Sequence, residues 1–305
     1  MSLETELSSA WGMHGEDWSQ GGLTLRPALE GRLGEHTDLV LSGRVRVTFD
    51  DALDGQVRDL AAYDKASRPA FERPVSLELR DAYLERSIGA GHLRIGKQQI
   101  VWGALDGLKL LDALNPQSFR SFILDDFDES RISQWGALLA WPIAGGELEL
   151  AIIPDQSVHE LPAAETTFAL TAERFAFGLR DARLAPALAG LRRAGGRDRD
   201  LRSGGVTWGS RYSRFAGGWD LAISYQQGLD HQPIGQLQAR GSGAAELVLA
   251  HRQRRVLGFA ASKSFGALAL RTELAWRPGR SFNRVAVDGD NPARLTRVRR
   301  DHWGL

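Results

Sequence analysis

Residues 23–50 read LTLRPALEGRLGEHTDLVLSGRVRVTFD, and this stretch decides the fold class. On both sides of the GEHT segment, apolar residues occupy the odd positions and charged or polar residues occupy most even positions. Successive side chains of a β-strand point to opposite faces, so each half would have one apolar and one charged face. The stretch therefore predicts two antiparallel strands joined by a short turn at residues 34–37.

The same alternation recurs along the chain. It is clearest at residues 75–79, 135–141, 175–179, 206–212, 219–225 and 268–276. We count about 14 candidate strands, many of them near the roughly 9 to 11 residues that a tilted membrane strand needs. The pattern predicts an all-β, antiparallel fold that forms a single domain over residues 1–305.

Strand length separates two all-β architectures. Strands of a soluble sandwich average about 5 to 6 residues, whereas several strands here extend to roughly ten residues without a charge on the apolar face. Trp219, Tyr225 and Trp276 lie near the ends of apolar faces, as in the aromatic girdles of membrane barrels. These features favour an up-and-down transmembrane β-barrel. A soluble core filled by the same rings is the alternative.

Composition excludes other classes. The 305 residues include 38 Lys and Arg against 38 Asp and Glu, which argues against nucleic-acid binding through bulk charge. No apolar stretch approaches the roughly 20 residues of a membrane-spanning helix. The chain has no Cys, so it has neither a disulfide nor a thiolate metal site.

Short and long connections alternate along the chain. Residues 34–37, 87–91 and 144–146 form short connections, and residues 51–74, 103–131 and 181–204 form long ones. In membrane barrels this alternation separates the periplasmic turns from the outer loops. The spacing therefore agrees with a meander whose long loops gather at one end.

No enzyme signature is present, and we expect no catalysis and no cofactor. Two acidic clusters could supply oxygen ligands to calcium: Asp125, Asp126, Asp128 and Glu129, and Asp288, Asp290 and Asn291. Neither has the full spacing of a calcium loop, so a polar turn is the favoured interpretation.

Three neighbouring segments resemble a known family: LRIGKQQIVWG at 93–103, DGLKLLDALNPQSFR at 106–120 and ILDDFDESRISQW at 123–135. With GGWDLAISYQQGLD at 217–230, they are similar to an uncharacterised, porin-like family of Gram-negative outer-membrane β-barrels with a domain-of-unknown-function name. The resemblance implies an outer-membrane location and a role in solute uptake. Family members begin with a secretory signal and continue further, so we expect the signal and some C-terminal strands to be missing here.

The connection at 103–131 is too apolar for a solvated loop, and its leucines and phenylalanines need a surface to bury against. We hypothesise that it folds inward and narrows the pore, with a turn set by Asn115 and Pro116. A packed lid outside the barrel is the alternative. The candidate residues of this signature loop are Trp102, Gly103, Asp106, Lys109, Asp112, Asn115, Pro116, Arg120, Asp125, Asp126, Asp128 and Arg131.

The charged faces of the first strands would line the lumen. The expected lumen-facing residues are Arg26, Glu30, Arg32, Arg44, Arg46, Glu78, Arg80 and Arg94. Because Arg outnumbers Glu in this set, we predict a mild preference for polar or anionic solutes.

The sequence thus predicts a porin-like channel whose partners are outer-membrane lipid and a small solute, and a homo-oligomer is compatible with it. Two alternatives stay open: an outer-membrane barrel enzyme or adhesin with a calcium-binding acidic loop, and a soluble all-β binding protein.

Overall fold

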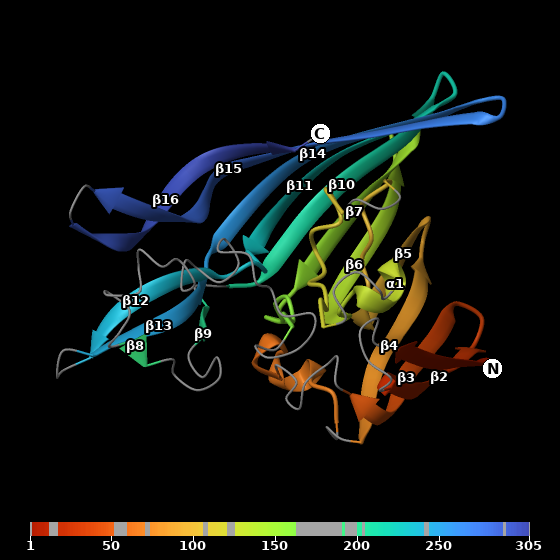
Figure 1. Ribbon diagram of the computed structural model, residues 1–305. Helices are drawn as coiled ribbons and strands as arrows, with labels where there is room; N and C mark the ends of the chain where they lie inside the picture. Colours follow the sequence, from red (N-terminus) through yellow and green to blue (C-terminus); the bar gives the residue numbers. More distant parts are fainter. Residues whose placement is uncertain are drawn as a thin grey trace.

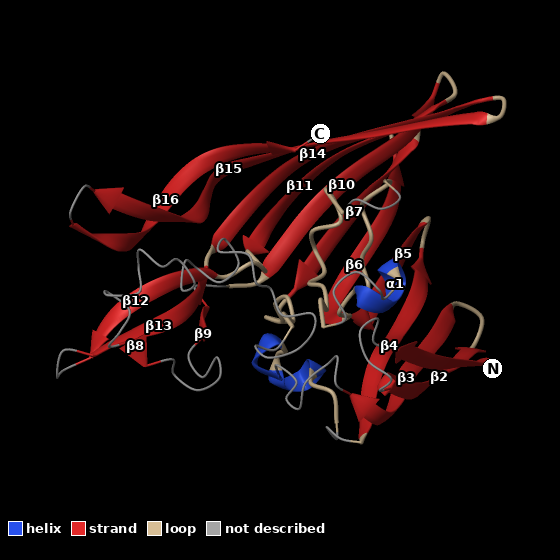
Figure 2. Cartoon of the chain, in the orientation of Figure 1, coloured by secondary structure: helices blue, strands red, loops and turns tan. Residues whose placement is uncertain are grey.

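The computed structural model describes residues 2–11, 18–51, 60–70, 74–105, 109–120, 126–162, 191–192, 200–202, 205–240, 244–288 and 291–304. Most of these residues are in β-strands (Figure 1). The described helical turns are short and lie in the connections: α1 (Phe127–Ser130), η1 (Leu60–Ala62) and η2 (Lys65–Ser67), as Figure 2 shows. Among the described residues, no helix has the length and apolar character needed to cross a membrane.

A twelve-stranded antiparallel sheet dominates the fold, and its spatial order follows the chain as a meander. Its strands are β1 (Ser2–Trp11), β2 (Trp18–Arg32), β3 (Thr37–Asp51), β4 (Val75–Ile88), β5 (Gly91–Gln98), β6 (Gln134–Ile143), β7 (Gly146–Ile153), β10 (Thr207–Ala216), β11 (Trp219–Leu229), β14 (Gln253–Phe265), β15 (Leu268–Asp288) and β16 (Asn291–Gly304). The all-β, antiparallel prediction is confirmed. In this order β1 and β16 are the two edge strands, and no pairing joins them among the described residues.

A second, smaller sheet departs from the predicted pattern. The hairpin of β12 (Ile234–Arg240) and β13 (Ala244–His251) lies in the connection between β11 and β14. Two short strands, β8 (Leu191–Arg192) and β9 (Asp200–Arg202), pair with β13 in parallel, so the purely antiparallel prediction is wrong for them. The candidate strand at 175–179 lies outside the described residues.

Tight turns gather at one end of the main sheet and long connections at the other. The tight turns are residues 33–36, 89–90, 144–145, 217–218 and 266–267, and the long connections are 52–74, 99–133, 154–206 and 230–252. Gly34 and Gly89 adopt positive φ angles of 87° and 59°, which glycine allows without strain. At the long-connection end, Tyr63, Ile132, Val158 and Leu229 pack into a hydrophobic cluster with Ala62. The predicted alternation of short and long connections is confirmed from β2 to β15, whereas only two residues separate β15 from β16 at the end of the long connections.

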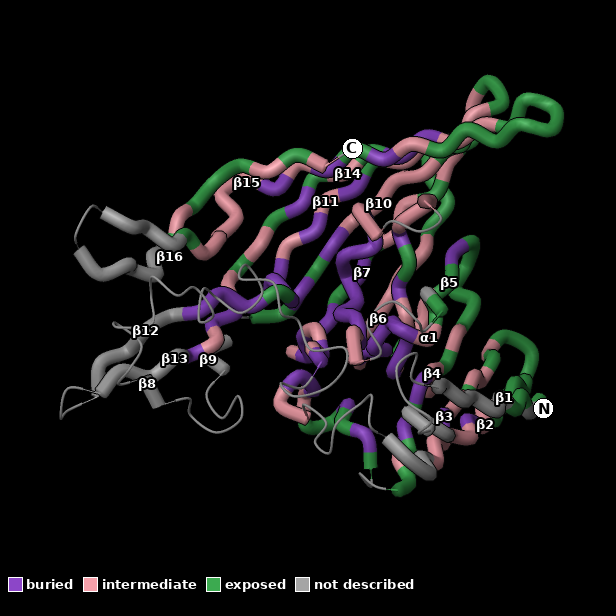
Figure 3. The backbone as a smooth tube through the Cα atoms, in the orientation of Figure 1, coloured by how far each residue is buried: buried purple, intermediate pink, exposed green. Residues whose placement is uncertain are grey.

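The two faces of the main sheet have opposite chemistry, visible as alternating burial along the strands in Figure 3. One face exposes large apolar side chains: Leu84 is 44% exposed and Ile95, its partner across β4 and β5, is 55% exposed. The other face is polar and buried, and Arg44 on β3 is only 2% exposed. Soluble monomers rarely expose apolar surface on this scale, so the pattern is the reverse of an ordinary soluble core.

Candidate functional site

The connection between β5 and β6 crosses the polar face of the main sheet. Near its end, the Glu129 carboxylate lies 2.8 Å from Arg44 Nη1 on β3. Nearer its start, the Leu110 carbonyl accepts a hydrogen bond of 2.7 Å from Arg277 Nη2 on β15. β3 and β15 are the third and eleventh strands of the twelve, so this one connection contacts distant parts of the sheet. The sheet curls around the described parts of this connection (Figure 1). We call residues 99–133 the crossing segment, of which the structure describes 99–105, 109–120 and 126–133.

The crossing segment packs onto a row of small residues. Ser224, Gly258, Ala275 and Gly304 lie opposite one another on β11, β14, β15 and β16. A side chain at Gly258 would place its Cβ 2.5 Å from Leu111 Cδ2, and one at Gly304 would collide with Leu110. The Trp102 ring lies in the same way on Gly209 of β10. Small residues on five strands thus make room for the apolar side chains of the segment.

Glu273 on β15 holds the backbone of the crossing segment. Its carboxylate accepts hydrogen bonds from the N–H groups of Ala104, Leu105 at 3.2 Å and Leu111 at 3.0 Å. Gln226 of β11 donates to the Leu111 carbonyl at 3.0 Å. The sequence analysis missed both residues. Alternation along β11 and β15 places both residues on the inward-facing row together with other polar side chains, and that row was the signal that could have found them.

Asn115 and Pro116 tie the two ends of the crossing segment together. The Asn115 side chain accepts from the Ile100 N–H at 2.7 Å and donates to the Ile132 carbonyl at 3.0 Å. The Ile132 N–H donates to the Pro116 carbonyl at 2.9 Å. Asn115 and Pro116, where the turn was predicted, therefore hold the first and last residues of the crossing segment together through hydrogen bonds.

A charged cluster is buried within the crossing segment. Arg131 contacts Asp112 at 2.6 Å and also pairs with Asp128. Lys109 donates to Gln117 and, at 2.7 Å, to the Ser130 hydroxyl. Burial lowers the pKa of Lys109 to about 8. Burial raises the pKa of Asp112, and the Arg131 guanidinium opposes that shift.

Arginines of β2, β3 and β4 face the other end of the segment. Arg44 contacts both Glu78, at 2.7 Å, and Glu129. Arg26 lies 3.3 Å from Glu129, and Arg80 donates to the Asp128 carbonyl at 2.7 Å. These contacts place Arg26, Arg44, Glu78 and Arg80 on the polar face of the sheet.

The other residues that were predicted to face the lumen differ in how far they are buried. Arg46 is half-buried on β3 two residues from Arg44, and Arg94 pairs with Glu85 at 2.8 Å. Glu30 and Arg32 are exposed near the β2–β3 turn, because the sheet extends beyond the crossing segment at that end, and Arg32 pairs there with Asp38.

The candidate residues of the signature loop also differ in how far they are buried. Arg120 is half-buried and Gly103 lies beside Asp112, whereas Asp126 is exposed. Asp106 and Asp125 lie outside the described residues. Among the residues that are described, no group of three potential ligands could hold a metal ion.

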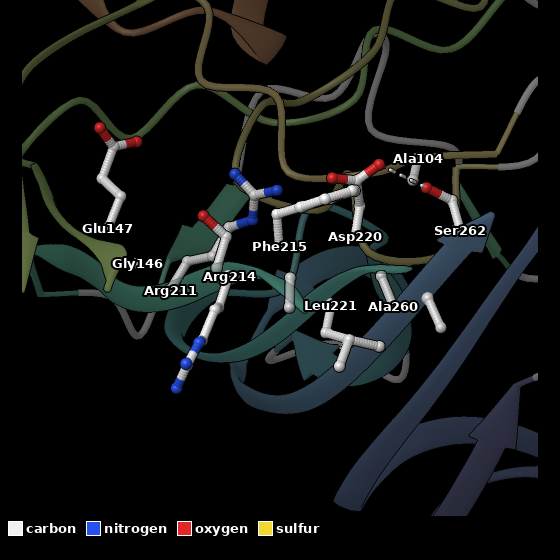
Figure 4. A pocket seen from close by; sticks show the side chains of 13 residues that line it. Ala104, Gly146, Glu147, Arg211, Arg214, Phe215, Asp220, Leu221, Ala260 and Ser262 are labelled. Atoms are coloured by element: carbon white, nitrogen blue, oxygen red, sulfur yellow. Dashed lines mark hydrogen bonds between the residues drawn. The ribbon is translucent and has the colours of Figure 1, made fainter. Parts of the chain in front are cut away.

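A cavity of ≈ 470 Å³ lies toward the tight-turn end of the polar face (Figure 4). Its lining includes Ala104 of the crossing segment and Ser213, Asp220, Ala222 and Ser262 of the strands. Arg211, also in the lining, pairs with Glu149 at 2.7 Å. The cavity is therefore mixed, with charged groups beside small apolar ones.

Comparison with known proteins gives a family. A solved structure, Salmonella typhi OmpF in complex with daunomycin, is 9% identical over 96% of this chain and 80% of that chain, with a TM-score of 0.30. No curated protein matches the chain. A family model described as a protein of unknown function, DUF1302, matches residues 25–293. The chain belongs to the DUF1302 family.

Proposed function

We propose that the chain acts in the outer membrane as a porin-like channel for small polar or anionic solutes, without catalysis. The observation that carries the proposal is the exposure of the two faces of the main sheet: the apolar face is exposed and the charged face is buried. In a barrel wall, lipid covers the apolar face and solutes meet the polar face.

The apolar face has the composition expected of a lipid contact. Tyr225, Leu257, Trp276 and Trp303 form a continuous row across β11, β14, β15 and β16. The rings of Trp276 and Trp303 stack with centroids 5.7 Å apart, although Trp303 is 63% exposed. Exposed aromatic pairs of this kind suit the interfacial region of a bilayer.

The crossing segment supplies the narrow part of the proposed channel. It contacts β3 and β15 from the polar side, so a solute that passes along this face meets the half-buried Lys109 and the exposed carboxylate of Asp128. Charges next to low-dielectric walls act strongly on a passing ion. The arginines of β2, β3 and β4 would favour anions.

Planar-bilayer recordings test the proposal. We expect discrete conductance steps and a reversal potential on the anion-selective side in a salt gradient. The double variant Arg44→Gln and Arg46→Gln should move the reversal potential toward cation selectivity. Arg32→Gln is the matched control, because Arg32 is exposed and pairs with Asp38 outside the curl. Absence of conductance, or cation selectivity that the double variant leaves unchanged, contradicts the proposal.

A further inference from the structure

The Glu129 carboxylate sits among arginines that belong to other elements. Oε2 lies 2.8 Å from Arg44 Nη1 and 3.3 Å from Arg26 Nε. The same Arg44 nitrogen also donates to the Glu129 carbonyl at 3.0 Å. One carboxylate thus binds two guanidinium groups on adjacent strands.

The two sides of this contact differ in how they are fixed. Arg26 and Arg44 extend from paired strands, and Glu78, also on a strand, fixes Arg44 at 2.7 Å. Glu129 belongs to α1, a four-residue helix within the crossing segment. Its side chain is 22% exposed and that of Arg44 is 2% exposed, so Glu129 is the more accessible partner. The arginines are the rigid half of the contact, and the carboxylate is the half that can leave.

We propose that Arg26 and Arg44 form a binding site for a carboxylate-bearing solute, and that Glu129 occupies this site as an internal stand-in that the solute displaces. This inference rests on the proposed channel function and names the chemical class of its solute. Displacement of the Glu129 carboxylate leaves α1 held to the strands by the backbone carbonyls of Asp128 and Glu129.

The chemistry of the site selects a carboxylate. A guanidinium group offers several N–H donors in a planar fork that matches the oxygens of a carboxylate. Glu129 shows that this group fits between the two arginines. Burial raises the pKa of Glu129, but Arg44, Arg80 and Arg26 together lower it below its usual value, so the site favours the ionised form.

Chemical rescue tests the proposal in detergent, where no current is needed. Glu129→Ala removes the stand-in, and propionate carries the same carboxylate on a two-carbon chain, one carbon longer than the part of the side chain that alanine lacks. We expect the variant to melt at a lower temperature and propionate to restore most of the loss. Neutral propionamide should restore none of it. Wild type should bind propionate at least about tenfold more weakly, because the tethered Glu129 competes at high effective concentration.

The matched control is Asp38→Ala, which leaves Arg32 without the partner of an exposed pair. We expect no rescue there, because a single exposed arginine forms no enclosed site. Equal effects of propionate and propionamide on Glu129→Ala would overturn the proposal, as would equal propionate affinity in wild type and variant. If Glu129→Ala fails to fold, the binding of propionate and of inorganic phosphate to wild type replaces the rescue. We expect the two anions to compete, and Arg26→Gln to abolish the binding of both. If Arg26→Gln abolishes the binding of only one anion, the site is contradicted.

The two proposals fail separately. Rescue without any bilayer conductance supports the carboxylate site and contradicts the channel. Conductance without rescue supports the channel and contradicts the site.

Discussion

The carboxylate of Glu273 on β15 accepts the backbone N–H of Leu111 at 3.0 Å, across 162 positions of sequence. The same carboxylate accepts the N–H groups of Ala104 and Leu105. Glu273 is only 1% exposed, so bulk water does not reach the backbone N–H groups that it accepts. Together with Gln226 and Arg277, this side chain holds the crossing segment against the far strands of the sheet.

Replacing Glu273 by alanine should release that segment. Each buried donor left without an acceptor costs about 1–3 kcal/mol, so we expect the free energy of unfolding to fall by about 3 kcal/mol. Urea titration in detergent measures this fall. Glu273→Gln keeps one carbonyl oxygen and should lose less than half as much. An unchanged urea midpoint for the alanine variant contradicts the role of Glu273.

A methyl group at Gly258 should displace Leu111. The added Cβ would approach Leu111 Cδ2 to 2.5 Å, and overpacking of this kind typically costs about 1–3 kcal/mol. We expect Gly258→Ala to lower thermal stability and Leu111→Ala in the same chain to recover part of the loss. Gly31→Ala is the control, because nothing lies within 4 Å of the position of its Cβ. Equal melting temperatures for Gly258→Ala and Gly31→Ala would show that the segment does not pack on this strand.

Lys109 should make ion selectivity depend on pH. Burial lowers its pKa to about 8, so its positive charge disappears as pH rises through 8. We expect anion preference to fall between pH 7 and pH 9, measured as the reversal potential. Lys109→Arg keeps the charge over this range and should remove the change. A shift of equal size in this variant assigns the titration to another group.

His159 should make the fold sensitive to acid. Its Nδ1 atom accepts the Gln117 N–H at 2.9 Å, so this bond requires an unprotonated nitrogen. Burial lowers the pKa of His159 to about 3. In the unfolded chain His159 takes up a proton near pH 6.5, whereas in the folded chain it stays neutral until about pH 3. The free energy of unfolding should therefore fall as pH decreases from 6.5 toward 3.

Melting curves between pH 7.5 and pH 4.5 measure this loss. Burial also lowers the pKa of His231, whose ring lies 5.4 Å from that of His159. His159→Gln keeps an acceptor without a titrating ring and should flatten the pH dependence. The prediction fails if the slope in the variant equals that in wild type.

Much of the fold follows from local periodicity. Residues 23–50 form the predicted hairpin. It was predictable because the alternation of apolar and charged residues, as at Leu25 and Arg26, can be read within each strand without knowledge of its partners. The pairing of β8 and β9 with β13 was not predictable, because strands of two or three residues carry no period.

The candidate site was predictable only in part. The apolar character of the crossing segment indicated that it needed a surface, and Leu111 and Leu114 are buried there. The partners of that segment depend on curling of the sheet, which brings Glu273 to residues far away in sequence. No local pattern contains that information.

The orientation of the two sheet faces is the central claim, and spin labels test it directly. Because the chain has no Cys, single cysteines can be placed at Ile223 and Ala222 of β11 in protein reconstituted into vesicles. Ile223 is 59% exposed on the apolar face, and Ala222 lines the cavity on the other. We predict that a nitroxide at 223 collides mainly with lipid-dissolved oxygen and one at 222 mainly with a water-soluble relaxant. Equal access of the water-soluble relaxant to both positions contradicts the account.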